Sequence, residues 1–149
     1  MNTVKHLNGS KLPPLQKKRS IFWNKPYFAV AVMAIILGTL LDHFFVTRGM
    51  YEFPVRPLPE EFSINIDFTL IVLPIFVVLI LHLILQVKKW GRIGIILFVS
   101  LLMPVGEKLA EALGLFRHSE QWEHIYSFFG YLIFWSVIYG FYRWLEQRD

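Results

Sequence analysis

The stretch IDFTLIVLPIFVVLILHLILQV, residues 66–87, decides the fold of this chain. Asp67 and His82 are its only charged or histidine side chains, and Pro74 lies within it. A helix rises 1.5 Å per residue, so about 20 apolar residues span the roughly 30 Å hydrocarbon core of a bilayer. The stretch therefore predicts a membrane-spanning helix.

Three further apolar segments predict helices over 27–46, 92–113 and 122–144. In the third helix, the strongly apolar run 93–105 is too short to span by itself. Residues 108–113 are strong helix formers and Gly114 is a typical helix stop, so they favour extension to 113 over an end near Gly106. We predict an all-α fold, a four-helix transmembrane bundle over residues 27–145, with the third helix kinked at Pro104.

Composition agrees with this class. The chain is 55% hydrophobic and 17% aromatic, with a mean hydropathy of +0.48, which is high for a soluble domain. It contains no cysteine, so disulfides, thiolate metal sites and cysteine nucleophiles are excluded. Basic residues flank the apolar runs and form no stripe of their own, so no nucleic-acid partner is expected. The sequence has no glycine-rich phosphate loop, Gly-x-Ser-x-Gly elbow or zinc-protease helix motif that would predict an enzyme class.

The distribution of basic residues predicts orientation. Eleven of the fifteen Lys and Arg residues flank the two termini or follow the second helix, and four fall in the other two loops: Arg48, Arg56, Lys108 and Arg117. By the positive-inside rule, both termini are expected in the cytoplasm of a cell carrying this multi-pass protein in its cell membrane. Residues 1–26 then form a basic cytoplasmic tail and residues 146–149 a cytoplasmic end. The run Lys17-Lys18-Arg19 could contact anionic lipid headgroups.

Ionisable side chains inside the apolar runs are the candidate site. Charge in hydrocarbon is costly, so such residues indicate a partner or a function. Asp42 and Glu107 are expected roughly 6–8 Å below the outer boundary of the membrane. The candidate polar cluster consists of Asp42, His43 and Glu107, with Asp67, Glu111 and His124 peripheral to it.

Three roles for this cluster remain open. The leading hypothesis is a structural clasp with Lys108, Thr39 or Thr47, which predicts a non-enzymatic membrane component. The second is a divalent-metal site in a membrane-embedded metal-dependent enzyme, because carboxylates and histidines bind such ions. The spacings Glu107-xxx-Glu111 and His118-xxxxx-His124 are only weakly specific for it.

The third role is a small ion or proton carrier that acts as an oligomer. Small residues that allow close helix approach, Ala34, Gly38, Gly130 and Gly140, favour a homo-oligomer or a membrane protein partner.

The stretch EKLAEALGLF, residues 107–116, followed by RHSEQW, residues 117–122, resembles a motif of a known family. That family comprises uncharacterised small multi-helix integral membrane proteins of spore-forming Bacillota. In them a Glu-containing helix ends in Gly-Leu-Phe, and a short polar loop leads to Trp and the last helix. The resemblance implies a bacterial cell-membrane protein but no activity, and the chain departs from the family in its long basic tail and at Phe53-Pro54. The residues of this chain that match motif positions of the family are Asp67, Glu107, Gly114, Leu115, Phe116 and Trp122.

Overall fold

The computed structural model describes residues 25–148 and is mainly helical. The all-α prediction is confirmed, while the predicted basic tail lies, up to residue 24, outside the described residues. The elements in chain order are α1 (Lys25–Thr47), β1 (Tyr51–Glu52), the π-helix η2 (Phe68–Val72), α2 (Leu73–Gln86), α3 (Lys89–Ala112), β2 (Arg117–His118) and α4 (His124–Glu146).

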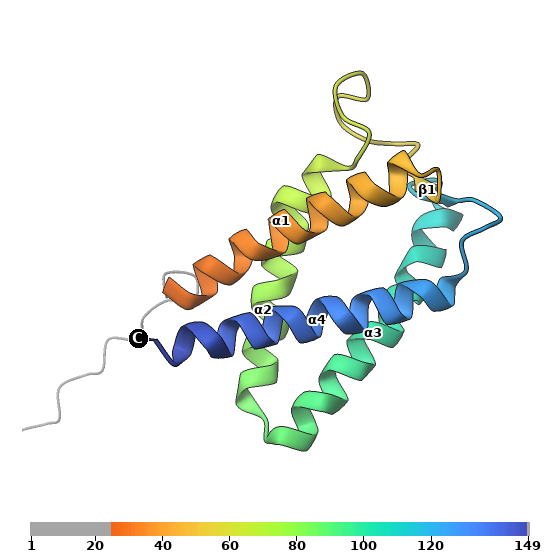
Figure 1. The fold of residues 1–149 in the computed structure, drawn as a ribbon. Coiled ribbons are helices and arrows are strands. Elements are labelled where there is room, and N and C mark those ends of the chain that lie inside the picture. The colour runs from red at the N-terminus through yellow and green to blue at the C-terminus, as the bar shows by residue number, and fades with distance from the viewer. Residues whose placement is uncertain (1–24, 149) are drawn as a thin grey trace, which may run out of the picture.

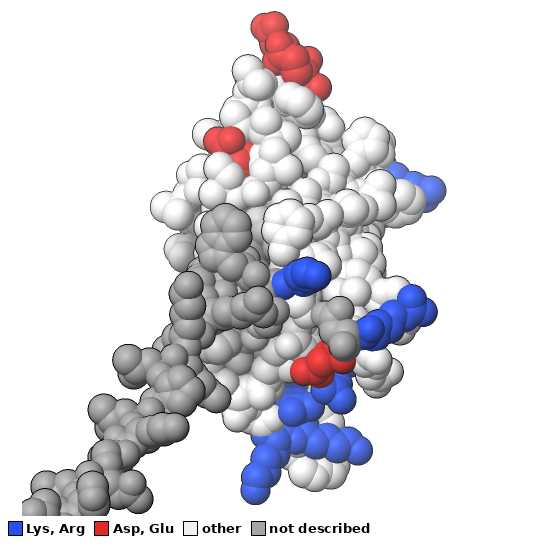
Figure 2. Space-filling model, turned by 90° about the vertical axis from the view of Figure 1, so that its left-hand side faces the viewer, with Lys and Arg blue, Asp and Glu red and all other residues white. Residues whose placement is uncertain are grey.

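Four helical segments are long and apolar enough to cross a membrane, with η2 and α2 forming one of them. In the most apolar 18-residue stretch of each segment, only 11–33% of the residues are buried, so most apolar side chains face outward. Figure 2 shows the same property from one side: Lys and Arg gather mostly toward the lower end, Asp and Glu lie at the upper end and also among these basic side chains, and most of the remaining surface is uncharged.

Consecutive helical segments run in opposite directions (Figure 1). Tyr27, near the start of α1, contacts His82, near the end of α2, and Arg92, near the start of α3, contacts Tyr139 of α4. α1 packs on α2 and α4, and α3 packs on α4. The core between them includes Val30, Ala34, Val77, Leu81, Trp135 and Ile138, all at most 1% exposed.

Two prolines lie within the long helical segments. Pro74 has no N–H to donate to the carbonyl four residues earlier, and its ring clashes with that carbonyl. The π turn η2 ends two residues before it, at Val72. Asn65 caps the start of this segment, because its Oδ1 accepts the Phe68 N–H at 3.2 Å. Pro104 lies inside α3, which continues to Ala112 and does not end near Gly106. The kink at Pro104 stays a prediction.

The helices α1 and α3 end in the same way. Gly114 has a φ of +72°, its N–H bonds to the Glu111 carbonyl, and the Leu115 N–H bonds to the Ala110 carbonyl. This pair of backbone hydrogen bonds defines a Schellman motif. Gly49 ends α1 with the same pattern at a φ of +68°. Each motif turns the chain sharply, so that β1 and β2 leave their helices side by side.

The two short strands join the loops at one end of the bundle, which we call the sheet end. β1 pairs antiparallel with β2, with Tyr51 opposite His118 and Glu52 opposite Arg117. An ion pair of 3.0 Å between Arg117 and Glu52 supports the pairing, as does a 2.9 Å bond from the Ser119 N–H to the Met50 carbonyl. Both loops are therefore fixed over the same end of the helices.

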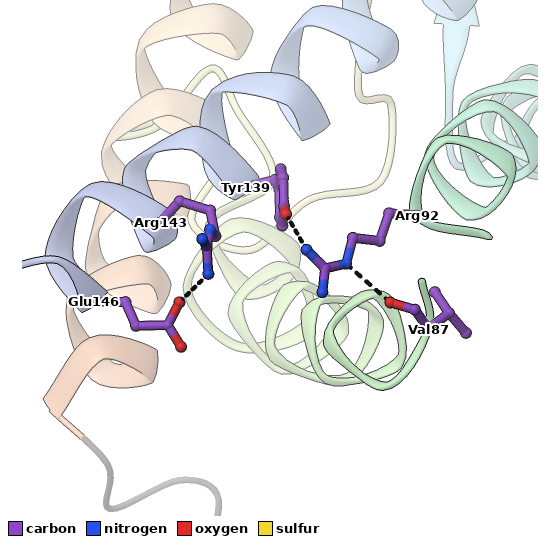
Figure 3. Close-up of polar contacts among 5 residues, drawn as sticks. All are labelled: Val87, Arg92, Tyr139, Arg143 and Glu146. Carbon is purple, nitrogen blue, oxygen red and sulfur yellow. Dashed lines mark hydrogen bonds and ion pairs between the residues drawn. The ribbon is translucent and has the colours of Figure 1, made fainter. Parts of the chain in front are cut away.

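At the opposite end of the bundle, which we call the termini end, Arg92 and Arg143 make polar contacts (Figure 3). Arg92 donates to the Tyr139 hydroxyl at 2.7 Å and to the Val87 carbonyl at 2.9 Å, which ties the α2–α3 turn to α4. On α4 itself, Arg143 pairs with Glu146. These contacts use the polar heads of side chains whose stems lie along the apolar helices.

Candidate functional site

A cavity of about 280 Å³ opens near the sheet end, and all four helical segments contribute to its wall. Most of the lining is apolar or aromatic, including Phe45, Trp122 and Phe134. Asp42 reaches it from α1 and Glu107 from α3. The two carboxylates that the sequence placed at similar depth thus share one chamber.

Asp42 is held by hydroxyl groups from two other elements. The Tyr51 hydroxyl of β1 donates to Oδ1 at 2.8 Å, and the buried Thr69 hydroxyl of η2 lies 3.4 Å from Oδ2. Burial, with a further contribution from the Asp42 charge, raises the pKa of Tyr51 well above its usual range. The phenol therefore stays protonated and donates to the carboxylate. The Thr69 hydroxyl also lies 3.0 Å from the Asn65 carbonyl, so its single proton serves one acceptor at a time.

Glu107 joins α3 to α4. The Ser127 hydroxyl, on a side chain that is almost fully buried, donates to its Oε2 at 2.5 Å. The same oxygen lies 3.8 Å from the His124 Nδ1, beyond hydrogen-bond distance. Both carboxylates therefore link different elements, as a clasp would, but through other partners than the sequence suggested. Thr47 donates instead to carbonyls of its own helix, those of His43 and Phe44.

Two predicted residues lie apart from this chamber. His43 follows Asp42 on α1, and successive residues point about 100° apart around a helix. Its side chain is exposed and does not line the cavity. Asp67 is also exposed and makes no capping bond, because Asn65 caps that helical segment. The structure therefore separates these two side chains from Asp42 and Glu107.

A second group of ionisable side chains lies beside the chamber. Glu111 in the last turn of α3, His118 of β2 and His124 at the start of α4 bring one ligand atom each within 4.8 Å of one another. The shortest separation is 2.6 Å, between Glu111 Oε1 and His118 Nδ1. All three residues are partly buried, which suits a site that a small ion can enter. Among the described residues, this triad is a possible metal site.

The triad changes the ranking of the predicted site residues. Glu111 and His124 were expected at the periphery of the cluster, and His118 was considered only for its spacing from His124, not as a member of the cluster. The signal that could have indicated it was Gly114, since a Schellman turn there reverses the chain over the end of α3. The pairing of β2 with β1 then places His118, but no local pattern predicts so short a pairing of distant loops.

No protein-family model matches the chain, and no curated protein or solved structure matches it either. The geometry of the two sites is therefore the basis for assigning a function. The chamber offers two carboxylates on an apolar wall. The triad offers two imidazoles and a carboxylate at its rim.

Proposed function

We propose that the chain is a multi-pass protein of a bacterial cell membrane, a four-helix transmembrane bundle with both termini in the cytoplasm. The four apolar helical segments, their outward-facing side chains and the charged ends of the molecule support the proposal. The excess of Lys and Arg at the termini end supports the proposed orientation, by the positive-inside rule. The family resemblance at residues 107–122 agrees with it.

Single cysteines test this topology, because the natural chain has none. Glu60→Cys lies in the loop at the sheet end and Lys88→Cys in the turn at the termini end, and both positions are exposed. A membrane-impermeant maleimide should label Glu60→Cys in intact cells and Lys88→Cys only after permeabilisation. The cysteine-free protein is the control. Labelling of Lys88→Cys in intact cells would contradict the cytoplasmic orientation, and equal labelling of both would contradict the spanning bundle.

Within that bundle, the chamber is proposed to bind an amphiphile with a cationic or hydrogen-bond-donating head. The observation that carries this function is the presence of Asp42 and Glu107 on the wall of one otherwise apolar cavity. Each carboxylate has about four lone-pair positions, and the protein hydroxyls occupy only some of them. The remaining acceptors can receive an ammonium group, while the aromatic wall receives the adjoining alkyl chain. The protein is then a non-enzymatic, ligand-binding membrane component.

Trp122 on the chamber wall provides the readout. A brominated dodecylammonium probe, titrated into the protein in lipid nanodiscs, should quench tryptophan fluorescence saturably, and Trp122→Phe should remove that component. A charged hydrogen bond contributes about 1.5–3 kcal/mol, so Asp42→Asn or Glu107→Gln should weaken binding at least about tenfold.

The exposed carboxylate variant Asp67→Asn is the matched control and should bind like the natural protein. Quenching that does not saturate, or that is the same in Asp42→Asn, Glu107→Gln and the natural protein, would show simple partition of the probe into the bilayer. Either result would overturn the binding proposal.

A metal-dependent enzyme is the second candidate function. The observation in its favour is the triad of Glu111, His118 and His124, which lies next to Glu107. A metal ion there could activate a water for hydrolysis of a molecule held in the chamber. This function requires a bound ion, so a protein that takes up no divalent metal would exclude it.

A further inference from the structure

We propose that Glu111, His118 and His124 bind one divalent metal ion of the zinc class, which fastens the sheet end of the molecule. The proposal does not depend on ligand binding in the chamber. It assigns a site at which three separate segments of the chain meet: the last turn of α3, the strand β2 and the first residue of α4.

The spacing of the ligand atoms fits a small ion. Zinc binds nitrogen and oxygen at about 2.1 Å, so neighbouring ligands of a tetrahedral site lie about 3.4 Å apart. The three ligand atoms lie within 4.8 Å of one another, and the closest pair, Glu111 Oε1 and His118 Nδ1, is 2.6 Å apart. The close pair must separate and the wider pairs must approach. These changes are at most about 1.4 Å, which is within the reach of a side-chain rotation.

One ring nitrogen of each histidine lacks a hydrogen-bond partner among the residues that the structure describes. The Nδ1 atoms of His118 and His124 are buried and have no hydrogen bond among the described residues. The contact between His118 and Glu111 is short but lies outside hydrogen-bond geometry. Buried polar atoms without a partner are rare, and each one requires an explanation. A cation that accepts both nitrogen lone pairs explains them together.

An ion pair between a protonated His118 and Glu111 is the alternative. It would account for the 2.6 Å approach of these two side chains. It would leave the buried His124 Nδ1 without a partner, since the Glu107 carboxylate is 3.8 Å away. A metal ion therefore accounts for more of the geometry than the ion pair does.

The donor set indicates the kind of ion. Two imidazole nitrogens and one carboxylate oxygen are typical of zinc sites that keep a fourth position open, and the same donor set also binds non-haem iron(II). Magnesium and calcium prefer oxygen ligands alone, and copper(I) prefers sulfur, which this cysteine-free chain does not offer as thiolate. Glu107 lies one turn before Glu111 on α3, and its Oε2 is 3.8 Å from His124 Nδ1. It is near enough to fill the fourth position or to accept a hydrogen bond from a water bound there.

A metal ion at this site would stabilise the two loops at the sheet end. His118 lies opposite Tyr51 in the β1–β2 pair, and Tyr51 holds Asp42 on the chamber wall. The two-residue strands are too short to be stable by themselves. An ion that fixes β2 to α3 and α4 would therefore also stabilise β1 over the chamber.

Metal analysis of the full chain tests the site. The protein should be purified in detergent through a tag without histidines, stripped with a chelator and titrated with Zn²⁺, and with Co²⁺ for its visible spectrum. One ion per chain and a tetrahedral Co²⁺ spectrum are expected. Loss of a residue that only supports a metal ligand already costs about 10–100-fold in affinity, so His118→Ala and Glu111→Gln should each weaken binding at least about 100-fold.

His43→Ala is the matched control, because His43 is an exposed histidine of α1 outside the triad. It should bind the ion like the natural protein. Glu111→Gln keeps the size of the side chain, so it remains informative if His118→Ala does not fold. The proposal is overturned if the natural protein binds no stoichiometric ion or if His43→Ala loses binding as well. It is equally overturned if Glu111→Gln binds like the natural protein. Quenching of Trp122 fluorescence by the brominated probe is measured separately on metal-free protein, so failure of one proposal is distinguishable from failure of the other.

Discussion

Replacement of Trp135 by alanine is expected to destabilise the bundle by about 3 kcal/mol. Trp135 is the largest fully buried side chain among the described residues, with 1% of it exposed. Its ring packs edge-to-face on Phe76 of α2 and on Phe134, with centroids 5.8 and 5.7 Å away. Removing a buried tryptophan costs about 3–5 kcal/mol in soluble proteins. For the proposed membrane bundle we expect the lower end of that range, because between helices surrounded by lipid no free energy is gained by moving apolar side chains out of water.

Chemical or thermal unfolding in detergent measures this effect. Trp144→Ala is the matched control, since Trp144 is 46% exposed near the end of α4 and packs on Phe141 and Arg148. Trp144→Ala should lower the free energy of unfolding much less than Trp135→Ala does. Trp135→Phe should destabilise the protein less than Trp135→Ala, because it keeps a ring in the core and removes an indole N–H that has no hydrogen-bond partner within residues 25–148. Equal destabilisation by Trp144→Ala and Trp135→Ala would contradict the central position of Trp135.

Replacement of Tyr51 by alanine is expected to have the second large effect. The ring contacts Phe45, Phe53, Phe116 and Trp122, with centroids 5.1–5.8 Å away, and the hydroxyl donates to Asp42. Alanine removes the aromatic contacts and leaves a mostly buried carboxylate without its nearest donor. The aromatic loss alone is about 3 kcal/mol, and the unpaired carboxylate adds about 1–3 kcal/mol.

Tyr51→Phe separates the two contributions, because it removes only the hydroxyl. It should cost about 1.5–3 kcal/mol, the range for a hydrogen bond to a charged group. In the Asp42→Asn background, Tyr51→Phe should destabilise the protein by at least about 1 kcal/mol less, because the hydrogen bond that it removes there joins two neutral groups. Tyr126→Phe, which alters an exposed tyrosine at the same cavity, is the control and should have little effect. Equal costs of Tyr51→Phe in both backgrounds would show that the hydroxyl does not serve Asp42.

The helices of this molecule could be predicted from the sequence because long apolar runs leave few alternatives. The segment predicted over 66–87 corresponds to η2 and α2, Phe68–Gln86, and that predicted over 27–46 to α1, Lys25–Thr47. Gly114 was correctly interpreted as the stop of α3, and its φ of +72° gives the physical reason. The π turn before Pro74 was not foreseen, because the sequence predicts only that the proline disturbs a regular helix there.

The candidate site could be predicted only in part. The high cost of burying charge indicated Asp42 and Glu107 as side chains that need partners, and both have partners on other elements. The partners themselves depend on turns that bring distant residues back over the helices. Tyr51 returns to Asp42 through the Gly49 turn, and His118 returns to Glu111 through the Gly114 turn. Such contacts follow from tertiary structure and leave no periodic signal in the sequence.

The pairing of β1 with β2 also restricts how the chain can thread a bilayer. Two hydrogen-bonded strands must lie on the same side of any membrane, whatever the hydropathy of the segments between them. The chain between Glu52 and Arg117 must therefore cross an even number of times, and it contains two long helical segments, η2–α2 and α3. If the strongly apolar η2–α2 segment crosses, parity requires α3 to cross back, although α3 includes Glu107 and Lys108. A pairing of only two residues on each strand thus excludes every three-crossing topology in which α3 lies along the surface.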